Sequence, residues 1–291
     1  MVAEIGLNHN SDLNIAFDLM KKAKRAGFDC VKFQKRTLHL VYTDEELDVP
    51  RESPWGTTNR EQKEGLEFGI EEYNSISEYA NSLGIHWTAS PWDENSIDFL
   101  THFYDDIPYI KIASAGLTDK DLLIAASEMG KPMFLSTGMS DANVILSAVD
   151  VIERHGGDIG CIYHCCSNYP QKVEESNLMA INTLKTIFPD IPIGYSGHEK
   201  GIAISVMAAV MGAMSIERHI TADRTMYGSD QAASLEPRGF NMLVRDIRDW
   251  ENARGDGTLR IYDSERPIMK KLRRNITIFE ADHESKGSVA V

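Results

Sequence analysis

The sequence predicts an α/β protein folded as a (β/α)8 TIM barrel. Eight short apolar segments alternate with eight stretches of helical period along nearly the whole chain. A doubly wound sheet is disfavoured because the chain has neither a Rossmann glycine fingerprint nor a P-loop. The length of 291 residues suits one such barrel. We expect the barrel to occupy residues 1–261 and a C-terminal tail to occupy residues 262–291.

The predicted strands are apolar runs with β-branched or aromatic residues, bounded by turn residues. In a parallel barrel their carboxyl ends meet at one rim, where such enzymes place their chemistry. The strands are expected at residues 2–5, 30–34, 86–89, 109–112, 133–135, 160–164, 193–195 and 215–218.

The predicted helices fall between these strands. The first has Ser11 and Asp12 as candidate N-caps, presents apolar residues at helical spacing and ends near Gly27. The others are expected at residues 71–83, 94–102, 119–129, 141–154, 175–188, 201–211 and 238–253.

A long polar insertion, residues 36–69, interrupts this rhythm after the second strand. A connection of that length is usually functional or mobile. Because it leaves the carboxyl end of a strand, it lies on the functional rim and is placed to cover a ligand. In the tail, the KKLRR run is explained by a solvated face or by contact with a partner.

Composition excludes several classes of function. A formal charge of −14 argues against general binding to nucleic acid or to a membrane surface, because both require a basic face. The N-terminus lacks the basic flank of a signal peptide, and no apolar run is long enough to span a membrane. The four cysteines show neither a disulfide nor a zinc spacing, so we expect reduced thiols and a cytoplasmic protein.

Two histidines, His198 and His219, stand at the ends of the last two predicted strands, near several acidic residues. If these strands are parallel neighbours, both imidazoles emerge at the same rim. The pattern indicates a divalent metal site with coordination positions open for substrate. The alternative is that each histidine simply satisfies hydrogen bonds. His164 is a candidate third imidazole, although a packed polar residue explains it better.

Two lysines, Lys32 and Lys111, lie inside otherwise apolar strands, where a buried ammonium requires a partner. An internal ion pair with Glu4 or Glu217 is one explanation. The other is a phosphate pocket, because hydroxyl groups at the ends of further strands supply directed hydrogen bonds. These hydroxyls belong to Ser114, Ser136, Ser167 and Ser196.

Further polar groups lie at the same rim. Asn8, His9 and Gln34 are suited to read sugar hydroxyls or, equally, to cap turns. Tyr169, before Pro170, is suited to contact a sugar or to anchor its loop. Cys165 and Cys166 have no base and orienting group beside them, so no thiol nucleophile is expected.

Several phrases together resemble the sialic acid synthase (N-acetylneuraminate synthase) family. They include AEIGLNHN, VKFQKR, TASPWDE, YIKIASA, KPMFLSTGMS, HCCSNYP, IPIGYSGHEKG and IERHITADRTMYGSDQAASLEP, followed by KKLRR. The likeness covers about residues 3–275 in register.

The resemblance implies an enzyme that condenses phosphoenolpyruvate with an open-chain N-acyl hexosamine such as N-acetylmannosamine, giving a sialic-type nonulosonic acid and phosphate. It implies a divalent ion on His198 and His219, manganese first and magnesium or cobalt as alternatives. Glu4 is then the expected proton-transfer residue, so Glu4, His198 and His219 form the catalytic set. The family's phosphoenolpyruvate site falls on Lys32, Lys111, Ser114, Ser136, Ser167 and Ser196, and its sugar-side groups fall on Gln34, Tyr169 and Asp230.

Two departures bear on substrate and assembly. Where many members carry an acidic residue that would contact the sugar, this chain has Ala115 followed by Gly116. Members usually continue into an antifreeze-like domain that covers the partner's site in a dimer, so a homodimer or other homo-oligomer is expected. The site here is then closed differently, works with a separate polypeptide, or belongs to a fragment of a longer protein. The alternatives are a synthase for legionaminic, pseudaminic or a related deoxy-sugar acid, and a non-catalytic barrel that binds metal and phosphate.

Overall fold

The computed structural model describes residues 1–274. The chain divides into two compact units, residues 1–246 and 247–291, and the division falls within helix α11 (Pro237–Ala253). The boundary expected at residue 261 stays a prediction. Of the expected tail, residues 275–291 lie outside the described residues.

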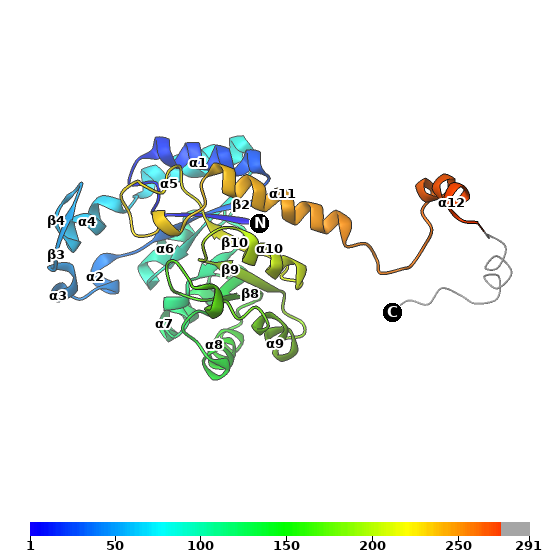
Figure 1. Cartoon of the computed structure of the whole chain (residues 1–291). Coiled ribbons are helices and arrows are strands. Elements are labelled where there is room, and N and C mark those ends of the chain that lie inside the picture. Colours follow the sequence, from blue (N-terminus) through cyan, green and yellow to red (C-terminus); the bar gives the residue numbers. More distant parts are fainter. Residues whose placement is uncertain (275–291) are drawn as a thin grey trace. The chain divides into compact units, whose positions relative to one another are not determined.

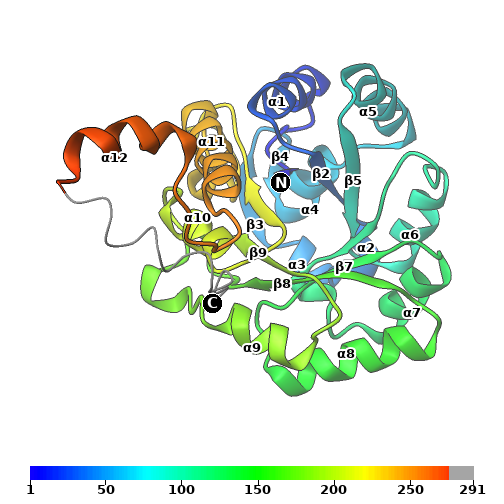
Figure 2. The same cartoon turned by 90° about the vertical axis from the view of Figure 1, so that its right-hand side faces the viewer.

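The first unit contains an eight-stranded parallel barrel, which confirms the predicted fold class (Figure 2). The strands neighbour one another in the order β5-β2-β1-β10-β9-β8-β7-β6. The ring is completed between the two ends of this order, where Thr88 Oγ1 of β5 donates to the Tyr109 carbonyl at 2.7 Å, just before β6. The strands are β1 (Val2–Gly6), β2 (Cys30–Lys35), β5 (His86–Pro91), β6 (Ile110–Ile112), β7 (Met133–Ser136), β8 (Ile159–Cys165), β9 (Ile193–Gly197) and β10 (Ile216–His219).

Helices surround the strands, as Figure 2 shows. The expected caps of the first helix are present: the Asp12 side chain accepts from the Asn14 amide, and Gly27 takes the left-handed conformation. The barrel helices are α1 (Leu13–Ala26), α5 (Ile70–Leu83), α6 (Glu94–Thr101), α7 (Lys120–Glu128), α8 (Ala142–Arg154), α9 (Ala180–Ile187), α10 (Ala203–Val210) and the first part of α11. The described part of the second unit adds a 3-10 turn (Asp263–Glu265) and α12 (Arg266–Leu272).

One helix is shorter than the pattern predicts. Residues 175–188 were expected as one helix, but the structure has a 3-10 turn (Val173–Glu175) and then α9 from Ala180. Asn177 between them has a φ of 38°, in the left-handed region, which interrupts a regular right-handed helix.

The insertion after β2 is folded rather than irregular. It contains α2 (Leu38–Val41), α3 (Asp44–Leu47), the hairpin β3 (Pro50–Ser53) and β4 (Gly56–Thr58), and α4 (Asn59–Leu66), grouped at one end of the barrel (Figure 1). An ion pair of 2.8 Å between Arg36 Nε and Glu67 Oε1 joins its two ends. Near its tip, Trp55 meets Tyr227 of the segment after β10, edge to face at 5.8 Å between ring centroids. The insertion therefore forms a wall beside the carboxyl ends of the strands.

The barrel interior is apolar towards the amino ends of the strands and polar towards their carboxyl ends. Val2, Cys30 and Tyr109 form a buried cluster, and Phe134 packs against it with its ring stacked on Tyr109 at 3.9 Å. Because side chains alternate along a strand, the next inward positions of β1 and β2 carry Glu4 and Lys32. No helix within residues 1–274 is long and apolar enough to cross a membrane.

Candidate active site

The predicted site residues meet in one cavity of about 230 Å³ at the carboxyl ends of the strands. Of the residues that the family resemblance assigns to the site, all line it except Asp230, which lies beside His219, with 4.0 Å between Asp230 Oδ2 and His219 Nδ1. The lining comprises Glu4, Lys32, Gln34, Ser90, Trp92, Lys111, Ala113, Ser114, Ala115, Ser136, Met139, Cys165, Ser167, Tyr169, Ser196, His198, Glu217 and His219.

Two lysines and two glutamates form the buried centre of this cavity. Lys32 Nζ lies 2.5 Å from Glu4 Oε2 and 3.6 Å from Glu217 Oε1. Lys111 Nζ also lies 3.6 Å from Glu217 Oε1 and donates to Ser136 Oγ. The internal ion pairs expected as an alternative to a phosphate pocket are thus present in this structure. Both lysines still face the cavity, where an anionic ligand can compete for them.

Burial and charge set the two carboxyl groups apart. Burial raises the pKa of Glu4 to about 7, against the opposing effect of Lys32. Burial also acts to raise the pKa of Glu217, but Lys111 and Lys32 together outweigh it and lower that pKa to about 2. Glu217 is therefore the fixed anion of the pair, and Glu4 is the carboxyl suited to exchange a proton near neutral pH.

The lysines respond to the same surroundings. Burial lowers the pKa of Lys111, and Glu217 offsets only part of this effect. Burial would lower the pKa of Lys32 too, but Glu217 and Glu4 outweigh it and raise that pKa. A second anion in the cavity would favour the charged form of Lys111.

Hydroxyl groups and one backbone amide complete an anion cradle around the lysines. Ser114 Oγ accepts from the Gly138 amide at 3.1 Å, and Ser196 Oγ donates to Glu217 Oε1 at 3.2 Å. A Cβ on Gly138 would lie 2.1 Å from Ser167 Oγ and 2.7 Å from Ser114 Oγ. Only glycine at position 138 lets the backbone approach both hydroxyls this closely.

The two imidazoles stand side by side at the ends of β9 and β10, with 5.6 Å between ring centroids. His198 Nδ1 is 2.7 Å from the Cys166 carbonyl, so Nδ1 carries the proton and Nε2 is left as a free electron pair. Burial, with the neighbouring His219, lowers the pKa of His198 to about 4, and burial lowers the pKa of His219. Both rings are therefore neutral at pH 7, the form that binds metal ions.

These residues fit a divalent ion of borderline softness. His219 Nδ1 is buried without a hydrogen-bond partner, and Asp230 offers carboxylate oxygen beside it. Within residues 1–274, no group of three or more histidine, cysteine, aspartate or glutamate side chains is arranged as a complete metal site. The pair would therefore need oxygen ligands from substrate or water, which suits a catalytic rather than a structural site.

Other rim residues divide between the cavity wall and the scaffold. Gln34 Nε2 donates to Glu4 Oε1 at 3.0 Å, and the Tyr169 ring lies 4.0 Å from that of His198, both on the cavity wall. Asn8, by contrast, is bound to the Ile220 carbonyl and to Ser234. His9 is buried against Phe68, with 4.0 Å between ring centroids. Asn8 and His9 thus support the loops rather than face the cavity.

His164 is not a third ligand in this arrangement. Its Nε2 lies 2.8 Å from the Ser176 carbonyl, and the residue is absent from the cavity lining. Its packed position agrees with the simpler of the two explanations drawn from the sequence.

The sequence did not single out several residues of the cavity. Ser90 accepts from Lys32 Nζ at 3.1 Å, and Glu217, expected only as a partner, touches both lysines. Ser90 lies near the end of β5 and Trp92 follows that strand, both in the phrase ASPWDE, so their position at a strand end was the available signal. Met139 comes from a loop whose path the pattern does not predict.

The two residues of the sequence departure, Ala115 and Gly116, face different ways. Ala115 lines the cavity, but a Cβ on Gly116 would meet Leu122 Cδ2 at 2.8 Å. In this backbone, position 116 faces the apolar interior behind the 3-10 turn (Ser114–Gly116) rather than the substrate.

Fold and site together define a class: a (β/α)8 barrel in which buried lysines, serine hydroxyls and a pair of neutral imidazoles share one cavity at the carboxyl ends of the strands. Comparison with known proteins identifies the family. Residues 19–259 match the model of the NeuB family, and the chain belongs to that family. It is a phosphoenolpyruvate-dependent nonulosonic acid synthase, which confirms the resemblance read from its motifs. Enzymes of this family generally use a divalent metal ion.

Relatives with different products are about equally similar. The chain is 38% identical to N-acetylneuraminate-9-phosphate synthase of Mus musculus, over 95% of this chain and 77% of the relative. It is 37% identical to N,N'-diacetyllegionaminic acid synthase of Legionella pneumophila, over 96% and 79%. The crystal structure of the N-acetylneuraminic acid synthetase of Leptospira borgpetersenii, in complex with citrate, has a TM-score of 0.80 and 32% identity, covering 94% of this chain and 92% of that one.

Proposed function

We propose that this chain condenses phosphoenolpyruvate with an open-chain N-acyl hexosamine, N-acetylmannosamine or a close analogue, to give a sialic-type acid and phosphate. The observation that carries the proposal is the shared cavity, which holds the lysine and serine cradle and the imidazole pair. Carbon three of phosphoenolpyruvate forms the new bond to the aldehyde carbon of the sugar. Water then adds at carbon two, and the bond from carbon two to the phosphate oxygen breaks.

Phosphoenolpyruvate is assigned to Lys32, Lys111, Ser114, Ser136, Ser167 and Ser196. In the structure, both ammonium groups lie beside the Glu217 carboxylate. The phosphate and carboxylate groups of phosphoenolpyruvate are the further anions that these ammonium groups would bind. Hydrogen bonds from ionised donors are stronger than neutral ones, so the lysines provide most of the affinity. The hydroxyls then fix the orientation, with that of Ser114 held in place by the Gly138 amide.

The sugar is assigned to the side of the cavity that carries Gln34, Tyr169 and Asp230. A divalent ion held by His198 and His219, manganese in this proposal, would polarise the aldehyde oxygen as a Lewis acid. Gln34 and Tyr169 are placed to hold the sugar chain against the wall so that its aldehyde meets carbon three.

Glu4 is assigned the proton transfer that accompanies addition of water at carbon two. Its carboxyl group is buried, with a pKa raised to about 7, and it is held by Lys32 and Gln34. A group of that pKa can take a proton from water and later return one at neutral pH. Glu217 stays ionised between the lysines and keeps them charged.

Phosphate release with a panel of aldoses tests the assignment. The purified protein with Mn2+ and phosphoenolpyruvate is expected to release phosphate with N-acetylmannosamine. Turnover only with diacetylated hexosamines would favour the alternative product, a legionaminic or pseudaminic acid. Tight binding of metal and phosphoenolpyruvate, with no phosphate release from any aldose, would instead favour the non-catalytic barrel and overturn the proposal.

Location and assembly complete the proposal. We assign the enzyme to the cytoplasm, because its four cysteines are free thiols in the structure. We also expect a homodimer or other homo-oligomer in which the mouth of the cavity is covered by residues outside this barrel. Light scattering of the purified chain checks the assembly, and a monomer at micromolar concentration would exclude it.

A further inference from the structure

A buried ion pair lies directly behind the two histidines. Arg218 precedes His219 in β10, and Glu199 follows His198 after β9. Arg218 Nη1 lies 2.7 Å from Glu199 Oε1, and both side chains are 0% exposed. Because side chains alternate along a strand, Arg218 points away from the cavity that Glu217 and His219 face. The pair touches no part of the cavity, so it cannot contact substrate.

The guanidinium group of Arg218 also donates hydrogen bonds to the backbone of the segment that follows His198. Arg218 Nη1 donates to the Gly201 carbonyl at 2.9 Å, and Nη2 donates to the Glu199 carbonyl at 2.6 Å. One planar group thus holds the segment that follows His198 at two separate points. His198 cannot move relative to β10, and hence to His219, without breaking these bonds.

The Glu199 carboxylate is itself fixed from two sides. Oε1 accepts from Ser205 Oγ at 2.6 Å, and Oε2 accepts from the Tyr195 hydroxyl at 3.1 Å. A Cβ on Gly197 would lie 2.4 Å from Glu199 Oε2, so glycine at that position leaves room for the carboxylate. Both carboxylate oxygens of Glu199 therefore have hydrogen-bond partners, and the glycine at position 197 leaves the space that the carboxylate occupies.

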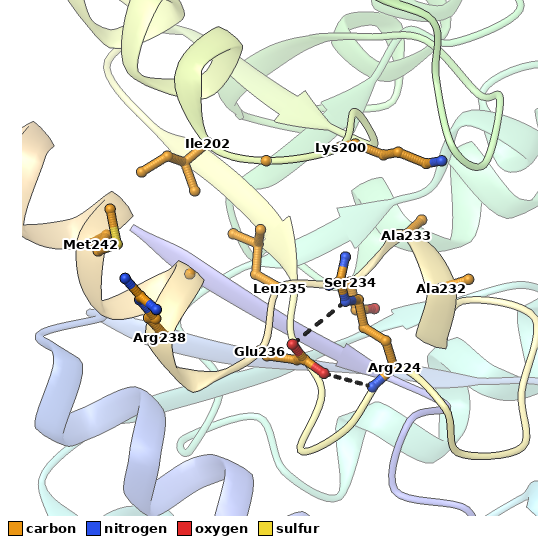
Figure 3. Close-up of a pocket in the computed structure, with 12 residues that line it drawn as sticks. Lys200, Ile202, Arg224, Ala232, Ala233, Ser234, Leu235, Glu236, Arg238 and Met242 are labelled. Carbon is orange, nitrogen blue, oxygen red and sulfur yellow. Dashed lines mark hydrogen bonds and ion pairs between the residues drawn. The ribbon is translucent and has the colours of Figure 1, made fainter.

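Packing from outside does not hold this segment. Lys200, Gly201 and Ile202 line a separate cavity of about 290 Å³, and Leu235 and Arg238 lie across it (Figure 3). On that side the segment faces open space rather than packed side chains. The bonds from Arg218 hold it on the β10 side, and the Gln171 amide, which donates to the His198 carbonyl at 3.0 Å, holds it from the loop after β8.

We infer that Arg218 and Glu199 are positioning residues that fix the separation and orientation of His198 and His219 for metal binding. A buried ion pair generally adds little net stability compared with apolar residues of the same size. Its function here is geometric: the pair locks the segment after one imidazole to the strand that carries the other. This inference rests on the proposed metal role of the two histidines.

Metal binding to the purified protein tests the inference without activity. Arg218→Lys keeps the charge balance but loses the planar fork, so it is expected to fold and to bind Mn2+ about 10- to 100-fold more weakly by titration calorimetry. Its affinity for phosphoenolpyruvate in the absence of metal is expected to stay within about twofold. Glu199→Gln weakens the bond to Arg218 from the carboxylate side. It too is expected to weaken Mn2+ binding and to leave phosphoenolpyruvate affinity within about twofold.

A matched control uses a second, partly buried pair of arginine and glutamate. Glu67→Gln weakens the bond to Arg36 at the base of the insertion, and it is expected to leave Mn2+ affinity within about twofold. His198→Ala separates the two claims. If His198→Ala keeps its Mn2+ affinity, the proposed metal role fails. If His198→Ala loses it while Arg218→Lys and Glu199→Gln bind Mn2+ as tightly as the wild type, the positioning inference alone is overturned.

Discussion

Replacing Lys111 by methionine removes one positive charge from the centre of the cavity while keeping the length of the side chain. Lys111 Nζ lies 3.6 Å from Glu217 Oε1, donates to Ser136 Oγ and stands 4.9 Å from the Tyr163 ring centroid. Since burial already lowers the pKa of this ammonium, an apolar replacement is expected to fold. What Lys111→Met loses is the charged donor offered to an anion.

The size of the loss follows from the kind of bond. A hydrogen bond to a charged group contributes about 1.5–3 kcal/mol. Losing 2–3 kcal/mol of this corresponds to phosphoenolpyruvate binding roughly 30- to 150-fold more weakly. The KM for the sugar is expected to change less than twofold, because the proposed sugar contacts lie on other strands. Titration calorimetry with phosphoenolpyruvate and initial rates against sugar concentration measure the two effects separately.

A second lysine provides the control. Lys131 also lies over an aromatic ring, 4.0 Å from the centroid of Tyr104, but it precedes β7 at the opposite end of the barrel. Lys131→Met is expected to leave both constants unchanged. If Lys111→Met weakens phosphoenolpyruvate and sugar binding equally, or neither of them, the assignment of the phosphate cradle is refuted.

Three further outcomes are expected. His198→Ala should abolish metal-dependent turnover, and most of the activity surviving would remove the metal role. Gly138→Ala should displace the Ser167 hydroxyl and weaken phosphoenolpyruvate binding roughly 5- to 10-fold, with little change in the melting temperature; unchanged binding would remove Ser167 from the cradle. Burial, with Arg36, lowers the pKa of His9 to about 3. The unfolded chain therefore takes up a proton on His9 at a higher pH than the folded chain does, and folding stability is lost as pH falls from 6.5 towards 3.

For His9 the measurement is the free energy of unfolding against pH. The shift corresponds to roughly 5 kcal/mol lost across this range from that one residue. His9→Phe, which cannot take up a proton, is expected to flatten the dependence, whereas the exposed His155→Asn should leave it as in the wild type. Identical slopes in all three proteins would show that His9 is not responsible.

The barrel could be predicted because its signals are local. Each strand is a short apolar run and each helix has a regular apolar face, so periodicity marked all eight strands. No elements were predicted within the insertion, because α2 and α3 are single turns and its hairpin is polar, too short for any period to appear. The break at Asn177 depends on one backbone angle that composition does not reveal.

The site was predictable as far as strand ends determine it. Lys32, Lys111, His198 and His219 lie on strands whose carboxyl ends must meet, so the topology alone brings them together. Which anion each lysine contacts depends on side-chain geometry across the barrel. The sequence therefore named Glu4 and Glu217 as possible partners without indicating that Glu217 lies beside both lysines. The ion pair of Arg218 and Glu199 lies behind the sheet, where sequence neighbours of the histidines carry no evident signal.

The most direct test of the account is anomalous scattering from a crystal of this protein soaked with Mn2+ and phosphoenolpyruvate. The account predicts one manganese peak bound by His198 and His219, and phosphate oxygens within hydrogen-bonding distance of Lys32 and Lys111 in the same cavity. Manganese bound away from both imidazoles, or phosphoenolpyruvate bound outside the lysine and serine cradle, would contradict it.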